Sequence, residues 1–213
     1  MAQVRRGERA GVQVLIVDTH CHALPHWFEP VELLLHQMKT YGVQKAALLQ
    51  VMGQFDNSYL FECVRRFPGK FSPTVIVDTG EADAPRALER WAREGAEGIR
   101  LNVLARSPGS DGLAIWRKAA ELGLVVSVYG KPDELASDTF ESIIRELPSL
   151  KFTIEHLAWA GQDAAPHAAF RKTLALARYP NVYMKFCGLG EICQRPVPFP
   201  QPMRPITCAC SPG

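Results

Sequence analysis

The sequence predicts an α/β fold: a TIM-type (β/α) barrel that is incomplete, with seven of the eight strand–helix units. Short apolar runs recur along the chain, amphipathic helical segments lie between them, and no glycine-rich phosphate loop follows the first run. A doubly wound open sheet is the alternative, and the lack of that loop counts against it. The runs begin near Val14, Lys45, Phe71, Glu97, Leu124, Lys151 and Asn181.

The first apolar run, Val14–Val17, is followed by the string DTHCH at 18–22. Such a run is typical of a parallel strand that is buried on both faces. Because side chains alternate along a strand, we expect Asp18, His20 and His22 on one face. Two imidazoles there can reach one metal ion or one substrate oxygen together. The alternative is a pair of loop histidines that only bond to the backbone.

Three helices between the strands have recognisable boundaries. Asp138 is placed to cap a helix that Pro148 stops. Asp111 is placed to cap a segment that ends before Gly123. A third apolar stripe covers residues 87–92. Helices of this length between strands favour a barrel built of regular units.

The chain divides into two predicted regions. Residues 1–190 hold the seven units of the barrel domain. Residues 191–213 form a tail rich in proline and cysteine, where proline excludes a regular helix and a central strand. We expect this tail to be an irregular, alternative or frame-shifted ending that does not supply the eighth strand.

Composition narrows the classes of function. The 47% apolar and 22% charged content is ordinary for a soluble enzyme. A net charge of +2 predicts no affinity for nucleic acid or a membrane surface, and no apolar run near the N-terminus is long enough to span a bilayer. The six cysteines form no CxxC pair and no disulfide framework, so we expect reduced thiols and a cytoplasmic protein.

Candidate site residues lie where strands end, because parallel barrels carry function at the carboxyl ends of their strands. Arg100 and Asn102 share one face of the run over 97–102. Arg100 could clamp a substrate carboxylate, or it could form a surface ion pair. Tyr129 ends the next strand, where its hydroxyl could donate to a substrate oxygen. The alternative is a tyrosine with one solvated end.

The last two runs add further candidates. His156 ends the run over 152–156, and strand alternation predicts that its side chain points inward toward the first-strand histidines. A structural histidine is the alternative. Lys185 shares a face with Tyr183 and Cys187 and is a candidate for substrate binding.

Four ordered strings carry a resemblance to a known family. They are VDTHCH at 17–22, GIRLN at 98–102, EHLA at 155–158 and NVYMKFCG at 181–188. Together they resemble the amidohydrolase-related (amidohydrolase 2) metal-dependent hydrolases, in the branch of carboxymuconate-semialdehyde decarboxylases and sugar or pyrone-dicarboxylate lactonases. The resemblance implies hydrolysis of a small carboxylate-bearing lactone, amide or related carbonyl compound, or a decarboxylase variant of that chemistry.

The resemblance also implies a divalent metal, zinc above all, held by His20, His22 and His156. It implies that His156 and Tyr129 serve the reaction and that Arg100 helps to orient the substrate, a role we extend to Asn102 and Lys185. The decarboxylases often carry a histidine where this chain has Tyr129, which is more similar to the lactonases, some of which need no metal.

One departure from the family pattern concerns the eighth strand. The family's eighth-strand aspartate is the expected metal ligand and general base, and Asp163 is the last aspartate of this chain. The chain therefore resembles a C-terminally truncated member. We expect weak metal retention and low activity, since losing a general base costs on the order of 10²–10⁴ in rate.

Two alternative functions stay open. TatD-type nucleases and PHP-type phosphoesterases share the Asp-x-His-x-His opening, but they need further ligands on intermediate strands. The other alternative is a non-catalytic, truncated product that associates with a full-length subunit. Expected partners are thus a small-molecule substrate and a second copy or a full-length subunit. Unpaired edges at the first and last strands would expose apolar surface and favour association or aggregation.

Overall fold

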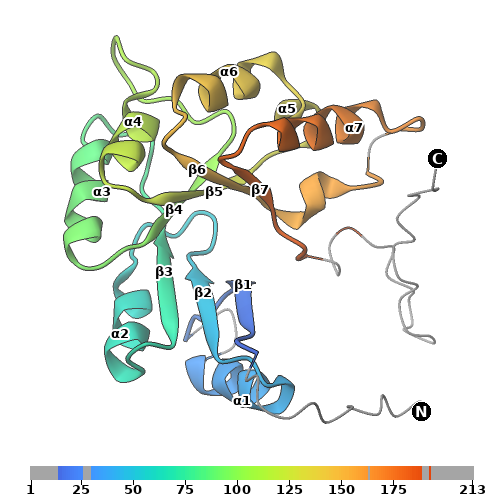
Figure 1. The fold of residues 1–213 in the computed structure, drawn as a ribbon. Coiled ribbons are helices and arrows are strands. Elements are labelled where there is room, and N and C mark those ends of the chain that lie inside the picture. The colour runs from blue at the N-terminus through green and yellow to red at the C-terminus, as the bar shows by residue number, and fades with distance from the viewer. Residues whose placement is uncertain (1–13, 26–29, 163, 189–191, 193–213) are drawn as a thin grey trace, which may run out of the picture.

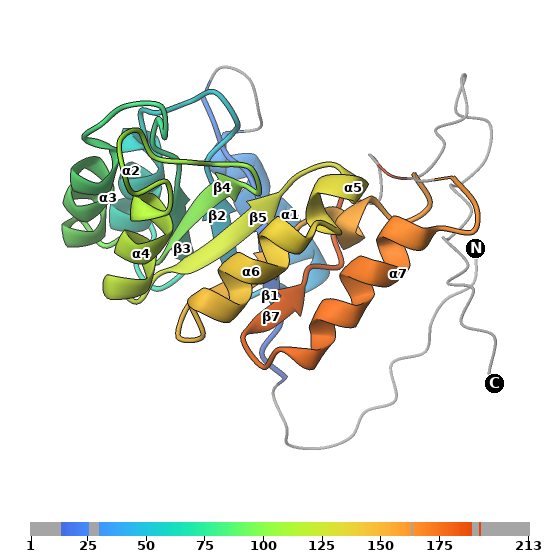
Figure 2. The ribbon, with the colours of Figure 1, turned by 90° about the horizontal axis from the view of Figure 1, so that it is seen from above.

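The computed structural model describes residues 14–25, 30–162, 164–188 and 192. These residues form a seven-stranded parallel sheet in the order β1-β2-β3-β4-β5-β6-β7. Every crossover therefore joins neighbouring strands, as in a (β/α) barrel. The sheet curls, and the helices cover its outer side (Figures 1 and 2). The predicted incomplete barrel is confirmed.

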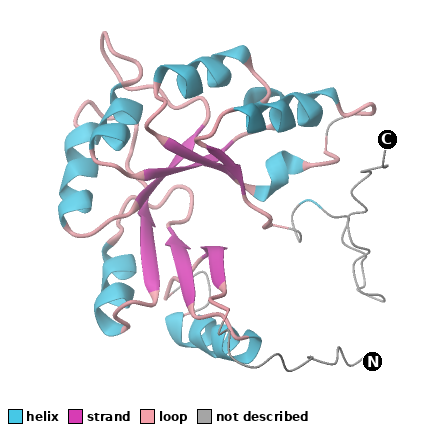
Figure 3. Ribbon diagram, in the orientation of Figure 1, coloured by secondary structure: helices cyan, strands magenta, loops and turns pink. Residues whose placement is uncertain are grey.

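Strands and helices alternate, with the strands at the centre and the helices around them (Figure 3). The strands are β1 (Val17–Cys21), β2 (Lys45–Leu49), β3 (Phe71–Val75), β4 (Gly98–Asn102), β5 (Val125–Tyr129), β6 (Lys151–Ile154) and β7 (Val182–Met184). The helices are α1 (Val31–Tyr41), α2 (Ser58–Arg66), α3 (Ala84–Arg93), α4 (Ala114–Glu121), α5 (Pro132–Leu135), α6 (Asp138–Glu146) and α7 (Ala168–Leu174), with 3-10 turns η1 (His156–Trp159) and η2 (Ala175–Arg178).

The two faces of the sheet differ in chemistry. The outer face packs its apolar side chains against the helices: the Phe152 ring of β6 lies 6.2 Å from Trp116 of α4 and 6.0 Å from Phe140 of α6, between ring centroids. The inner face carries the alternate residues, and these include the buried polar side chains Arg100 and Ser127. The apolar core therefore lies between sheet and helices, and the buried charged side chains Arg100, Glu155 and Lys185 lie on the inside of the curl.

The first strand differs from the expectation. β1 begins at Val17, and the side chains of the apolar run are 67%, 58%, 44% and 45% exposed from Val14 to Val17. Among the described residues β1 pairs with β2 alone, so it is an edge strand. The prediction of burial on both faces is wrong, because four apolar residues in a row do not reveal how many neighbours a strand has.

Two helix starts also differ from the expectation. Ser137 rather than Asp138 caps α6, and its hydroxyl oxygen accepts the Phe140 N–H at 3.1 Å. Helix α4 begins three residues after Asp111, whose carboxylate accepts the Leu113 N–H at 3.0 Å in the preceding turn. Both aspartates lie next to a helix start without being its cap.

The predicted tail lies almost entirely outside the described residues. Of residues 191–213, all but Ile192 lie outside the described residues, so the predicted irregular tail stays a prediction. Among the described helices, none combines the length and the apolar composition that a bilayer crossing requires.

Candidate active site

The end of β1 brings two imidazoles into contact. Pairing with β2 is irregular between Asp18 and Cys21, and the Asp18 carboxylate accepts the His20 N–H at 2.9 Å. Despite this irregularity, the Nε2 atoms of His20 and His22 lie 3.2 Å apart, while the Cys21 thiol turns away to the Ala47 carbonyl at 3.2 Å. The two histidines thus share one side, as alternation predicts.

Hydrogen bonds determine where the protons of these rings lie. His22 Nδ1 is 2.8 Å from the Leu49 carbonyl oxygen, and because a carbonyl only accepts, Nδ1 carries the proton. His22 Nε2 therefore presents a lone pair, to which the His20 Nε2–H donates. His20 Nδ1 then carries a second lone pair. This atom is buried and has no hydrogen-bond partner among the described residues. Burial lowers the pKa of His20 to about 3 and also lowers the pKa of His22, which favours neutral rings.

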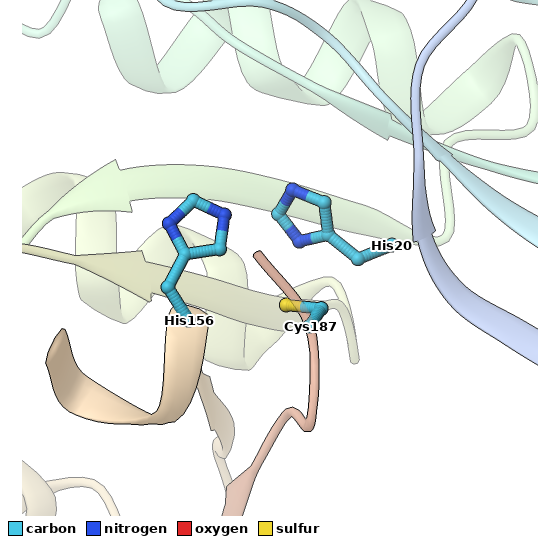
Figure 4. Close-up of side chains that lie close together, drawn as sticks. All are labelled: His20, His156 and Cys187. Atoms are coloured by element: carbon cyan, nitrogen blue, oxygen red, sulfur yellow. The ribbon is translucent and has the colours of Figure 1, made fainter. Parts of the chain in front are cut away.

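His156 reaches the same place by a route that strand alternation does not predict. Phe152 and Ile154 of β6 are fully buried in the outer, apolar layer, and alternation would place residue 156 with them. Instead, the φ angles over 156–159 are 50°, 50°, 51° and 57°. This left-handed turn brings the His156 ring to 5.0 Å from the His20 ring (Figure 4). The expected convergence occurs, but the parity argument for it is wrong.

Cys187 follows β7 and lies against the same rings. One ligand atom each of His20, His156 and Cys187 lies within 4.8 Å of the others (Figure 4). Gly188 packs closely against the His156 ring, because a Cβ at this position would lie 2.4 Å from His156 Cδ2. We call His20, His22, His156 and Cys187 the histidine cluster. The sequence placed Cys187 on the Lys185 face without assigning it a role.

The geometry of the histidine cluster fits a divalent metal ion. In a tetrahedral site with metal–nitrogen bonds of about 2.0–2.1 Å, neighbouring donors are separated by roughly 3.3 Å, and the two Nε2 atoms are 3.2 Å apart. The His22 Nδ1–H bond to a carbonyl is the outer contact typical of a metal-binding histidine. An ion bound to both Nε2 atoms would displace the proton that His20 Nε2 donates to His22, so His20 and His22 could hold the ion in the other tautomer of His20, with His156 within reach.

A second polar group lies beside the histidines on the inner face. Arg100 donates from Nε and Nη2 to the two carboxylate oxygens of Glu155, at 2.8 and 2.7 Å, and from Nη1 to the Gln50 carbonyl at 3.2 Å. Ser127 donates to Glu155 at 2.7 Å, and Lys185 Nζ donates to the Ser127 hydroxyl at 2.8 Å. We call these five residues the charge network. The predicted Arg100 ion pair exists, but it is buried rather than on the surface.

Arg100 determines the charge of Glu155. Burial by itself raises the pKa of this carboxyl, but the hydrogen bonds and positive charge of Arg100 outweigh burial and hold the pKa at about 2. Burial lowers the pKa of the Lys185 ammonium, against the opposing attraction of Glu155. Glu155 is thus an ionised, weakly basic carboxylate at neutral pH.

Tyr129 and Asn102 line two cavities at the carboxyl ends of β4 and β5. The cavities measure about 430 and 410 Å³, a size that suits a small molecule. Arg100 also lines the first, and its Cζ lies 5.2 Å from the Tyr129 ring centroid. The Asn102 side-chain oxygen accepts the Leu104 N–H at 2.8 Å. A larger cavity of about 640 Å³ runs along α3, and among the described residues no histidine lines any of the three cavities. We place the candidate site at the strand ends because Arg100, Asn102 and Tyr129 lie there.

The sequence missed part of this site. Glu155, Ser127 and Gln50 are buried polar partners that it did not single out. A signal was present for Ser127, which is a polar residue within the apolar string VVSVY and pairs with Arg100 in register. A buried arginine requires a partner, but the sequence does not say which carboxylate lies within reach.

The amidohydrolase family profile matches residues 17–207 of the chain. This chain belongs to the amidohydrolase family. The match covers the barrel and all four strings on which the resemblance rests. A search of the curated proteins finds no match to this amidohydrolase.

Several solved structures share the fold. A probable 2-pyrone-4,6-dicarboxylic acid hydrolase from Acinetobacter baumannii with citric acid bound is 15% identical with a TM-score of 0.68, over 84% of this chain and 72% of that chain. An amidohydrolase from Burkholderia multivorans with bound Zn is 18% identical with a TM-score of 0.63, over 83% and 70%. Amidohydrolase 2 from Bifidobacterium longum subsp. infantis is 18% identical with a TM-score of 0.56, over 81% and 72%.

The family and the fold agree on the class of this protein. At these identities the solved structures show the barrel fold, while the profile match shows the family. This amidohydrolase is accordingly a hydrolase-like enzyme of a superfamily that typically depends on a metal ion.

Proposed function

We propose that this amidohydrolase hydrolyses a small lactone, amide or related carbonyl compound that carries a carboxylate, with zinc held by His20, His22 and His156. The observation that carries the proposal is the convergence of these three imidazoles at the ends of β1 and β6, with two Nε2 atoms 3.2 Å apart. When bound, a divalent ion supplies Lewis-acid polarisation of the scissile carbonyl.

The surplus positive charge of the charge network supports a substrate carboxylate. The charge network contains two cations, Arg100 and Lys185, and one anion, Glu155. An ammonium has three N–H donors, and Lys185 gives one of them to Ser127. Lys185 therefore binds the substrate carboxylate in our proposal. Arg100 contributes its positive charge and positions the Lys185 ammonium through Glu155.

Tyr129 and His156 act on the reacting group. Burial raises the pKa of the Tyr129 phenol, so the hydroxyl stays protonated and donates to a substrate oxygen. His156 borders the first-strand histidines and would act on the reacting carbonyl compound through the ion that it helps to hold. Asn102 lines both cavities beside Tyr129 and holds the substrate from the β4 side.

Low turnover is part of the proposal. Glu155, the buried carboxylate beside the histidine cluster, is tied to Arg100 and is a weak base. A hydrolase without a positioned general base is slower by on the order of 10²–10⁴.

Association is a second candidate role, favoured by exposed apolar residues at both edge strands. Val17 of β1 and Tyr183 of β7 are 45% and 54% exposed, and Phe186 is 71% exposed. A second copy or a longer relative that pairs with these edges would cover them.

The test is hydrolysis of 2-pyrone-4,6-dicarboxylic acid, which the name of the Acinetobacter relative indicates, by zinc-loaded protein. We expect slow ring opening of the diacid. EDTA should stop this reaction and citrate should inhibit it. The dimethyl ester of the substrate should not be hydrolysed. His20→Ala should abolish it, and His36→Ala, at an exposed position of α1, should not. Equal rates for the diacid and the ester, or full activity of His20→Ala, would contradict the proposal.

A further inference from the structure

The end of β7 places a sulfur atom beside the two inner imidazoles. The Leu157 N–H donates to the Lys185 carbonyl at 3.1 Å, which ties the η1 turn to the end of β7. This contact holds Cys187 near His156, and Figure 4 shows the thiol beside the gap between His156 and His20. The three ligand atoms lie within 4.8 Å of one another.

These three side chains have the properties of a metal site. His20 contributes a buried Nδ1 without a hydrogen-bond partner among the described residues, in addition to the Nε2 that contacts His22. Nitrogen and sulfur together are the donor set that zinc prefers.

We propose that the Cys187 thiolate is a ligand of the metal ion, together with His20 and His156. This inference rests on the proposed function and revises its ligand set, because an ion bound through His20 Nδ1 cannot also be bound through the Nε2 atom of that ring, which contacts His22. With metal–sulfur bonds of about 2.3 Å, neighbouring donors in a tetrahedral site lie roughly 3.5 Å apart. Binding therefore draws the three atoms together by about 1 Å, which side-chain rotation of the half-buried Cys187 can supply.

Charge explains why a sulfur ligand belongs here. Neutral imidazoles leave the full charge of a divalent ion next to Arg100 and Lys185, with Glu155 as the compensating anion. A thiolate adds one negative charge at the metal. Burial keeps the free thiol protonated, so the sulfur–hydrogen bond is exchanged for a sulfur–metal bond, and the proton leaves to solvent.

The sulfur donor also determines which ions bind. Thiolates favour Zn²⁺ and the soft Cd²⁺ over Mg²⁺ and Ca²⁺, which prefer oxygen donors. We expect this amidohydrolase to take up Zn²⁺, Co²⁺ and Cd²⁺ and to leave Mg²⁺ unbound at equal concentration.

The first experiment loads metal-free protein with Co²⁺ and records its absorption spectrum. Wild type should show a thiolate-to-cobalt charge-transfer band in the near ultraviolet together with visible d–d bands. Cys187→Ser should lose the charge-transfer band, keep d–d bands, and bind Zn²⁺ at least about tenfold more weakly. The matched control is Cys63→Ala, which removes a buried thiol of α2 from the apolar core and should keep the band.

The possible outcomes separate the two proposals. A charge-transfer band that survives in Cys187→Ser, or cobalt-loaded wild type without this band, overturns the sulfur ligand and leaves the zinc hydrolase standing. Protein that binds neither Co²⁺ nor Zn²⁺ overturns both.

A second measurement uses wild type alone, in case Cys187→Ser fails to fold. Alkylation by iodoacetamide, mapped by peptide mass, should modify Cys187 in metal-free protein and slow by at least about tenfold once Zn²⁺ is bound. Equal alkylation of Cys187 with and without Zn²⁺ overturns the inference.

Discussion

The inner face of the sheet holds two polar groups that are built in opposite ways. In the charge network, donors meet acceptors: Arg100 and Glu155 pair through two hydrogen bonds, and Ser127 links them to Lys185. In the histidine cluster, ring nitrogens meet one another, and His20 Nδ1 has no partner among the described residues.

This difference indicates a division of labour. Buried polar groups are almost always hydrogen-bonded, so a saturated group contributes to stability, whereas an unsatisfied one gains free energy when a ligand arrives. The charge network joins β4, β5 and the ends of β6 and β7, which fixes their relative positions. The histidine cluster, placed on that frame, is where binding can occur.

The largest expected effect comes from breaking the charge network. Glu155→Ala leaves Arg100 buried and unpaired and should cost about 3–5 kcal/mol of unfolding free energy, measured by urea denaturation. Replacing both residues with methionine should recover most of the loss. Glu89→Ala, which removes an exposed ion pair with Arg93, should cost less than about 1 kcal/mol. Equal losses of unfolding free energy in Glu155→Ala and Glu89→Ala would contradict a structural role for the charge network.

Zinc should stabilise the protein through the histidine cluster. At a free concentration of 100 times Kd, Zn²⁺ should raise the unfolding free energy by about 2.7 kcal/mol, seen as a higher Tm that EDTA reverses. His20→Ala should abolish the rise and change the metal-free protein little, because the His20 Nδ1 is unsatisfied there. His36→Ala should respond as wild type does. If Zn²⁺ still raised the Tm of His20→Ala, the ion would bind outside the histidine cluster.

Gly188→Ala tests whether the position of the His156 ring matters. The new Cβ would lie 2.4 Å from His156 Cδ2, at a φ of +68°, and should cost about 1–2 kcal/mol from the backbone alone. Gly161→Ala has a φ of +80° and nothing within 4 Å, so it reproduces the backbone cost without the contact. Calorimetric titration should find Zn²⁺ affinity lowered in Gly188→Ala alone. Equal affinities in the two variants would show that the ring position does not matter.

The smallest effect on stability is expected at the β1 edge. Val17→Lys adds a charge at a position that is 45% exposed and should change the unfolding free energy by less than about 0.5 kcal/mol. It should still reduce self-association in light scattering, because charged side chains discourage pairing at sheet edges. Thr139→Lys, on the exposed side of α6, should leave association unchanged. If both variants associate like wild type, the edge is not the contact surface.

Some of this architecture could be predicted because it is local. Each strand–helix unit encodes its own periodicity, so the predicted strand starts lie within about three residues of those observed. The side-by-side placement of His20 and His22 also follows from their spacing of two residues at the end of one strand. The residue that caps α6 does not follow from local sequence, because Ser137 and Asp138 are neighbours that can both accept a backbone N–H.

The sequence by itself therefore determined the order of the units, the parallel sheet and the two histidines at the end of β1, since each depends on residues close together in the chain. Only the tertiary structure decided that Arg100 pairs with Glu155 55 residues away and that a left-handed turn carries His156 inward. These features depend on which segments meet in space and on backbone angles that side-chain patterns do not encode. The neighbourhood of Cys187 belongs to the same class, because a thiol becomes a candidate ligand only when folding brings two imidazoles beside it.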